Sequence, residues 1–272
     1  MDGLRAIAVI LVLLGHGRRT AGFPDAQPLR WLGQVGSVGV EIFFVLSGFL
    51  ITVLMLREIE RTGRLSLRAF YLRRILRIVP AYVCLLIAVA SLEYFGLSHP
   101  QRKDWVGALT YTVNFVPGRD WDLGHCWSLS IEEHFYLAWP LLVAALPVAW
   151  RGRAAAGGIV LSIGSRLIVL WIAPKLSILA DDWTFCRLDG IAAGCLLAVW
   201  AWQGRPILGW MTSCRWVGPF AVLGLVGSLS LALCSGKYGF GAAYTVNAAC
   251  ISALVWIAAC RGGRLLNSGP FI

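Results

Sequence analysis

Long apolar runs separated by short, arginine-rich segments dominate the pattern of this chain. Runs close to the thickness of a bilayer predict membrane-crossing helices. Eight ranges have this character: 4–17, 36–56, 78–97, 127–148, 157–174, 184–202, 216–234 and 240–260. The range 104–115 is too short and too polar to cross, so we expect an amphipathic or re-entrant piece on the outer side. The pattern predicts an all-α fold, a polytopic transmembrane helical bundle of about eight spans.

Composition supports a membrane protein and argues against a nucleic-acid partner. Hydrophobic residues make up 58% of the chain and charged residues only 14%, which is far from the balance of a soluble domain. The net charge is +10, but the basic residues lie between apolar runs instead of forming a solvated patch with interleaved aromatics. The eight cysteines show no CxxC spacing, so we predict neither a disulfide framework nor a metal site.

The distribution of basic residues predicts the orientation of the chain. With the N-terminus in the cytoplasm, the inner loops hold thirteen arginines and the outer loops hold eight lysines or arginines. Seven of the thirteen lie in the loop 57–77. Because cytoplasmic loops carry an excess of Lys and Arg, we predict a multi-pass protein of the cell (inner) membrane with a cytoplasmic N-terminus, in contact with membrane lipid.

The first helix carries two ionisable residues on one face. Arg5 and His16 stand eleven positions apart, about three helical turns or 16 Å along the axis. Lipid offers no partner to such groups, so both are expected to face the protein interior. The alternative is that Arg5 reaches the headgroups and His16 lies in a loop past the helix end. Imidazole, with an unperturbed pKa near 6.5, can take a proton from a hydroxyl and return it to a leaving group.

Further polar residues mark the second, third and fourth spans. Glu41 begins the second span near the level of His16, where its carboxylate could orient the ring or simply favour a helix N-terminus. Arg74 and Arg77 lie one turn apart and could clamp a phosphate. Glu132 and Tyr136 recur at a helical spacing and suggest the wall of a polar cavity.

Four stretches resemble the membrane-bound acyltransferase 3 family. The first is Arg5, ten residues and then His16. The others are Gly39-Val-Glu-Ile-Phe-Phe-Val-Leu-Ser-Gly-Phe-Leu-Ile-Thr52, Arg73-Arg-Ile-Leu-Arg-Ile-Val-Pro80 and Trp127-Ser-Leu-Ser-Ile-Glu-Glu-His-Phe-Tyr-Leu-Ala-Trp-Pro140. The resemblance covers most of the chain, with the motifs in the order of the family. The family usually has about ten spans, so it implies that 1–272 is a single transmembrane acyltransferase domain that lacks its last helices.

The resemblance implies an enzyme that moves an acyl group, with acetyl as the expected group, from cytoplasmic acyl-CoA to a hydroxyl of an envelope or extracellular glycan. It makes His16 the catalytic base or a transient acyl carrier, with Glu41 orienting it and Arg5 helping to position the donor. It assigns donor phosphates to Arg74 and Arg77, while Glu132 and Tyr136 line the path. No metal is implied. Two alternatives stay open: a transporter of an anionic solute, which predicts broken helices and inverted repeats, and an inactive truncated remnant.

Overall fold

The described part of the chain is almost entirely helical. The computed structural model describes residues 1–17 and 31–261, and these ranges contain no strand. The long helices are α1 (Asp2–Gly17), α2 (Trp31–Thr62), α3 (Leu67–Tyr94), α6 (Trp127–Ala145), α7 (Val148–Ile172), α9 (Thr184–Trp202), α11 (Val217–Cys234) and α13 (Tyr244–Arg261). Shorter pieces are α4 (Arg102–Leu109), η2 (Val113–Phe115), α5 (Trp121–Gly124), η3 (Pro174–Leu176), α8 (Ser177–Ala180), α10 (Pro206–Ser213), α12 (Gly236–Tyr238) and η4 (Gly239–Ala243).

Each of the eight predicted ranges overlaps a long helix. Only six helical stretches of the described chain, however, are long and apolar enough to cross a membrane. These six identify a membrane protein. The count differs from the prediction at both α1 and α6. The α1 helix has 16 residues, about 24 Å. The α6 helix has 19, and three consecutive polar residues, Glu132, Glu133 and His134, interrupt its apolar sequence.

The structure confirms the prediction for the non-crossing range 104–115 and contradicts the prediction for the loop 57–77. The range 104–115 forms no crossing helix, as predicted, because α4 is only eight residues long. The predicted inner loop 57–77 is wrong in most of its length: α2 continues to Thr62 and α3 begins at Leu67, so six of its seven arginines lie on helices. Of the predicted outer loop 18–35, residues 18–30 lie outside the described residues, as do residues 265–272 at the end of the chain.

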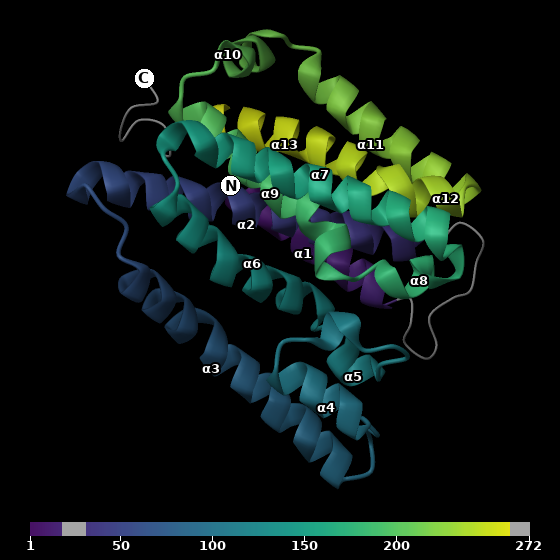
Figure 1. Cartoon of the computed structure of the whole chain (residues 1–272). Coiled ribbons are helices and arrows are strands. Elements are labelled where there is room, and N and C mark those ends of the chain that lie inside the picture. Colours follow the sequence, from purple (N-terminus) through teal and green to yellow (C-terminus); the bar gives the residue numbers. More distant parts are fainter. Residues whose placement is uncertain (18–30, 262–272) are drawn as a thin grey trace.

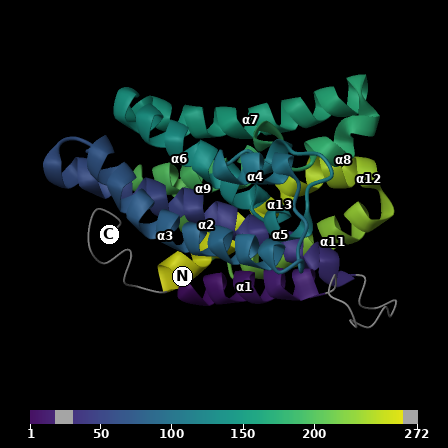
Figure 2. The same ribbon diagram turned by 90° about the horizontal axis from the view of Figure 1, so that it is seen from below.

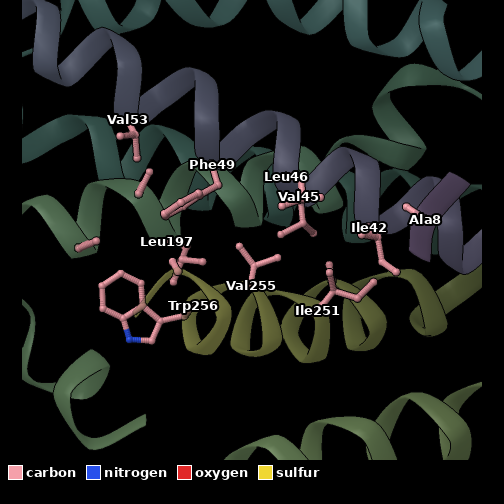
Figure 3. Close-up of a cluster of buried hydrophobic side chains, with 14 of the residues drawn as sticks. Ala8, Ile42, Val45, Leu46, Phe49, Val53, Leu197, Ile251, Val255 and Trp256 are labelled. Carbon is pink, nitrogen blue, oxygen red and sulfur yellow. The ribbon is translucent and has the colours of Figure 1, made fainter. Parts of the chain in front are cut away.

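The α2 helix is the centre of the bundle. Figure 2 shows α1 and α7 on opposite sides, with α2, α9 and α13 between them, and Figure 1 shows α11 alongside α13. Apolar side chains of α2, α9 and α13 meet in a buried cluster, drawn in Figure 3, in which Val45, Leu197 and Val255 are at most 4% exposed. This packing fixes the helix that carries most of the polar site.

Close contact between α2 and α9 depends on two glycines. A Cβ at Gly48 would collide with the carbonyl oxygen of Ile191, and one at Gly194 would collide with the carbonyl oxygen of Val45. Small residues let the backbones of membrane helices approach in this way. One turn before Gly194, a Cβ at Gly190 would lie 3.1 Å from the Cβ of Phe44 on α2, so this face of α9 is close to α2 over two turns.

The α3 helix is one of the two least enclosed candidate membrane-spanning helices, together with α11. Figure 1 shows it diverging from the bundle, with α6 between them and α4 at its far end. Two phenols hold it: Tyr71 donates to the carbonyl of Leu137 on α6 and Tyr82 donates to that of Ala108 on α4, both at 2.9 Å. Only 11% of its most apolar window is buried inside the protein, which suits a helix that borders lipid.

Candidate functional site

Two cavities open at opposite ends of α2. The histidine cavity has a volume of about 320 Å³. It is lined by Gly15, His16, Gly36, Ser37, Val40, Arg119, Asp120, Trp121, Gly124, His125, Trp127, Asp181 and Asp182. The arginine cavity has a volume of about 660 Å³. It is lined by Ile51, Leu54, Met55, Arg57, Glu58, Arg61, Thr62, Phe70, Arg73, Arg74 and Arg77. Along α2, Ser37 and Arg57 are separated by about 30 Å, the thickness of the hydrocarbon core.

His16 lies in the last turn of α1 and lines the histidine cavity. The alternative that placed it in a loop is therefore wrong. Its Nδ1 lies 2.8 Å from the carbonyl oxygen of Val12. Because a carbonyl oxygen can only accept, Nδ1 carries a proton, and in the neutral ring the lone pair then lies on Nε2. This is the tautomer that a general base toward a hydroxyl needs.

Two aromatic rings lie beside His16. The ring of Trp121 is centred 5.5 Å away and that of His125, in an edge-to-face arrangement, 6.4 Å away. Burial lowers the pKa of His125, and the nearby His16 lowers it further, against opposing effects of a backbone hydrogen bond at Trp121 and the charge of Asp122. The cavity thus holds a second imidazole with a preference for its neutral form.

Glu41 was expected to orient His16, but no hydrogen bond joins the two side chains in the described chain, so this role stays a prediction. Both carboxylate oxygens of Glu41 are buried and have no hydrogen-bond partner in the described chain, while the ring of His16 is held by Val12. Among the charged residues, Arg187 and Asp189 on α9 have the largest electrostatic influence on Glu41. Glu41 therefore belongs to a buried polar layer that also contains Arg187, beneath the cavity wall.

Glu132 and Tyr136 of α6 together link this helix to α2 and α3. Its carboxylate accepts hydrogen bonds from Ser47 of α2 at 3.0 Å and from Tyr136 at 3.1 Å. Arg74 of α3 stacks over the ring of Tyr136, 4.5 Å from its centroid. The sequence placed Glu132 and Tyr136 on one face of the helix, and the structure brings them together. Ser47 is a partner that sequence spacing did not reveal.

The arginine cavity concentrates positive charge. Arg74 is half-buried and Arg77 exposed on α3, and Arg57 and Arg61 extend from the end of α2. Arg73 is paired, since its guanidinium lies 2.9 Å from the carboxylate of Glu58. A cavity with this excess of guanidinium groups suits an anionic, phosphate-bearing ligand.

Arg5 shares the half-buried face of α1 with His16, as predicted. Its guanidinium pairs with Asp2 at 3.2 Å, and its side chain is 42% exposed. Arg5 lines neither of the two cavities described above. A contribution of Arg5 to donor positioning therefore stays a prediction.

Several polar residues of the site had no role in the sequence prediction. Arg187 lies 3.6 Å from the ring centroid of Tyr244 and 5.3 Å from that of Trp127. Tyr244 donates to Asp181 at 2.6 Å, and Arg119 pairs with Asp182. No group of three or more metal-ligating side chains comes together within residues 1–17 and 31–261.

Comparison with known proteins gives relatives that are longer than this chain. The O-acetyltransferase OatA of Staphylococcus aureus strain NCTC 8325 / PS 47 is 32% identical over 218 residues, which cover 74% of this chain and 34% of OatA. OatA of strain COL gives the same values. The chain thus matches about a third of the length of these relatives. No solved structure matches it. The family model described as an acyltransferase domain matches residues 1–268, and the chain therefore belongs to this acyltransferase family.

Proposed function

We propose that this chain is a membrane O-acyltransferase that moves an acyl group, such as acetyl, from acyl-CoA to the hydroxyl of an envelope or extracellular glycan. One observation carries the proposal. An imidazole with a free Nε2 lines one cavity and a cluster of guanidinium groups lines another, at opposite ends of the same helix. The family match and the O-acetyltransferase names of the relatives support this chemistry.

The donor is proposed to lie along α6. Arg74 and Arg77 hold its phosphates on the cytoplasmic side, while its elongated arm passes Tyr136 and Glu132 toward Trp127. Tyr136 and Trp127 are nine residues apart, so the arm has about 14 Å to cover between them. This places the thioester near His16 while the charged end of the donor stays among the arginines.

The acceptor hydroxyl enters the histidine cavity from the outer side. Its oxygen attacks the thioester carbonyl carbon, a C–O bond forms and the C–S bond breaks. The hydroxyl proton passes to Nε2 of His16 and then to the departing sulfur, so the products are an ester and the coenzyme A thiol. Val12 keeps the proton of Nδ1 in place throughout, which leaves Nε2 to do this work.

Transfer of label from radioactive acetyl-CoA to envelope material tests the proposal. We expect membranes with the wild-type chain to transfer label and His16→Ala to reduce the rate by about 100-fold or more, the usual loss for a general base. The matched control is His99→Ala, which alters an exposed histidine outside both cavities. Transfer that survives His16→Ala, or no transfer by the wild type, contradicts the proposal. Uptake of an anionic solute by the same vesicles would instead support the transporter.

A further inference from the structure

Asp181 differs from the other two carboxylates that line the histidine cavity. Asp182 is paired with Arg119, and Asp120 caps α5 by accepting from the backbone N–H of Asp122 at 2.9 Å. Asp181 accepts the Tyr244 hydroxyl through Oδ1 at 2.6 Å. No hydrogen bond within the described residues occupies its Oδ2. One oxygen is thus held by the protein, and the residue itself lines the cavity.

The phenol that holds Asp181 is itself contacted by two guanidinium groups. The guanidinium of Arg187 lies 3.6 Å from the centroid of the Tyr244 ring, and that of Arg166 lies 5.6 Å from it. Arg166 is fully buried and pairs with Asp189 at 2.9 Å. Cation–π contacts of this kind are strongest where water is excluded. Asp181 is therefore positioned by a network that spans α7, α9 and α13.

The same network supports an aromatic wall of the cavity. Arg187 lies over the ring of Trp127 at 5.3 Å, and Trp127 and Trp121 both line the cavity with His16. An aromatic ring packs well against the C–H face of a sugar, and a carboxylate accepts hydrogen bonds from hydroxyl groups but donates none. The cavity combines both features around the imidazole.

We propose that Asp181 determines acceptor specificity: its Oδ2 accepts a hydrogen bond from a hydroxyl next to the reacting one, and so selects a neutral, polyhydroxylated ring over an acidic one. A carboxylate on the acceptor would face Asp181 at close range without a proton to share, which is unfavourable by charge repulsion. The inference rests on the proposed acyl transfer for the identity of the reacting hydroxyl, but acceptor binding can be measured without it.

Two small acceptors that differ in charge test the inference: methyl glucoside, which is neutral, and methyl glucuronide, which is acidic. Binding to the full chain in detergent is measured by saturation-transfer NMR, and transfer from acetyl-CoA is measured in parallel. We expect the wild type to prefer the glucoside. Asp181→Asn should raise the Kd and KM for the glucoside about tenfold, because a hydrogen bond to a charged group is lost, with kcat within about twofold.

A matched variant separates the hydrogen bond from the general loss of charge. Asp182→Asn removes a neighbouring carboxylate that is already paired, and we expect it to keep the preference for glucoside within about twofold. Tyr244→Phe frees Oδ1 of Asp181 and should weaken the preference by a smaller factor than Asp181→Asn. Equal effects of the Asp181 and Asp182 variants, or a fall in kcat at constant KM, would overturn the inference.

The readouts distinguish this inference from the acyltransferase proposal. If the wild type binds the glucoside in preference to the glucuronide and Asp181→Asn abolishes that preference, the inference stands even when no label is transferred. If label is transferred but the wild type shows no preference, the inference fails while the acyltransferase proposal stands. If the wild type binds neither acceptor, the inference fails as well.

Discussion

The contact between Arg74 and Tyr136 predicts how the protein should respond to Arg74→Lys. Lysine keeps the positive charge at the arginine cavity but loses the planar group that stacks 4.5 Å from the Tyr136 ring. It also loses the fork that can bind a phosphate through two parallel hydrogen bonds. Arg77 is exposed, and no aromatic contact of its guanidinium is found in the described chain. Arg77→Lys therefore removes the fork but no stacking contact.

The magnitude follows from these contacts. A cation–π contact contributes about 0.5–2 kcal/mol, depending on how far water is excluded. The stack holds the guanidinium in place before the donor binds, and the loss of one of two charge-assisted hydrogen bonds to a phosphate is expected to weaken donor binding by about 1–2 kcal/mol. This corresponds to a rise in donor KM of about 5–30-fold for Arg74→Lys. A smaller rise, of about threefold or less, is expected for Arg77→Lys.

Two donors make the assay decisive. Initial rates are measured at saturating acceptor with acetyl-CoA and with acetyl-pantetheine, which has the same thioester but lacks the phosphates. Arg74→Lys should raise KM for acetyl-CoA only, with kcat unchanged, because the lost contact is made equally in the ground and transition states. Arg64→Lys, in the turn between α2 and α3, is the control. A fall in kcat at constant KM, or equal effects on both donors, would refute the reasoning.

Three further predictions concern packing, buried charge and pH. Gly194→Val should destabilise the fold by about 1–3 kcal/mol or more, seen as a lower Tm in detergent, whereas Gly227→Ala, with open space around it, should not. Arg166→Met leaves Asp189 buried without its partner and should cost about 3–5 kcal/mol by the same measurement; an unchanged Tm would contradict this. Burial raises the pKa of Asp181, against the opposing charge of Arg187, the Tyr244 hydrogen bond and the charge of Arg166, while Asp182 raises it further. Because the ionised form accepts the hydrogen bond, acceptor KM should rise on acidification from a higher pH than for an ordinary aspartate, and Asp181→Asn should remove that rise.

The membrane class and the helix positions could be predicted because apolar runs of bilayer length are typical of membrane-crossing helices and rare in soluble domains. The second and third helices were the exception. The ends of these helices carry arginines, and a hydropathy pattern assigns arginines to loops. The long side chain of arginine is nevertheless compatible with a helix that extends beyond the lipid. The α2 helix therefore continues to Thr62, six residues past its predicted end.

Contacts between distant parts of the chain account for what the sequence could not predict. Helical spacing placed Glu132 and Tyr136 on one face, but Arg187 and Asp189 of α9 find their partners on other helices. Spacing alone gives no information about which helix supplies them. Asp189 pairs with Arg166 on α7, a residue with no prior assignment. Similarly, the sequence placed Glu41 and His16 at the same depth in the membrane and so predicted that they interact. In the structure, the charged neighbours of the Glu41 side chain are those of α9 instead.

The glycine contact between α2 and α9 limits where this protein can open. These two helices meet backbone to backbone at Gly48 and Gly194, so they cannot slide or separate without losing their packing. The α3 helix, in contrast, has no such backbone contact and is held to its neighbours by side chains, among them Phe70, Tyr71 and Tyr82. The proposed passage of the donor beside α6 therefore predicts that α3 is displaced into the surrounding lipid, and that the fluidity of that lipid affects turnover.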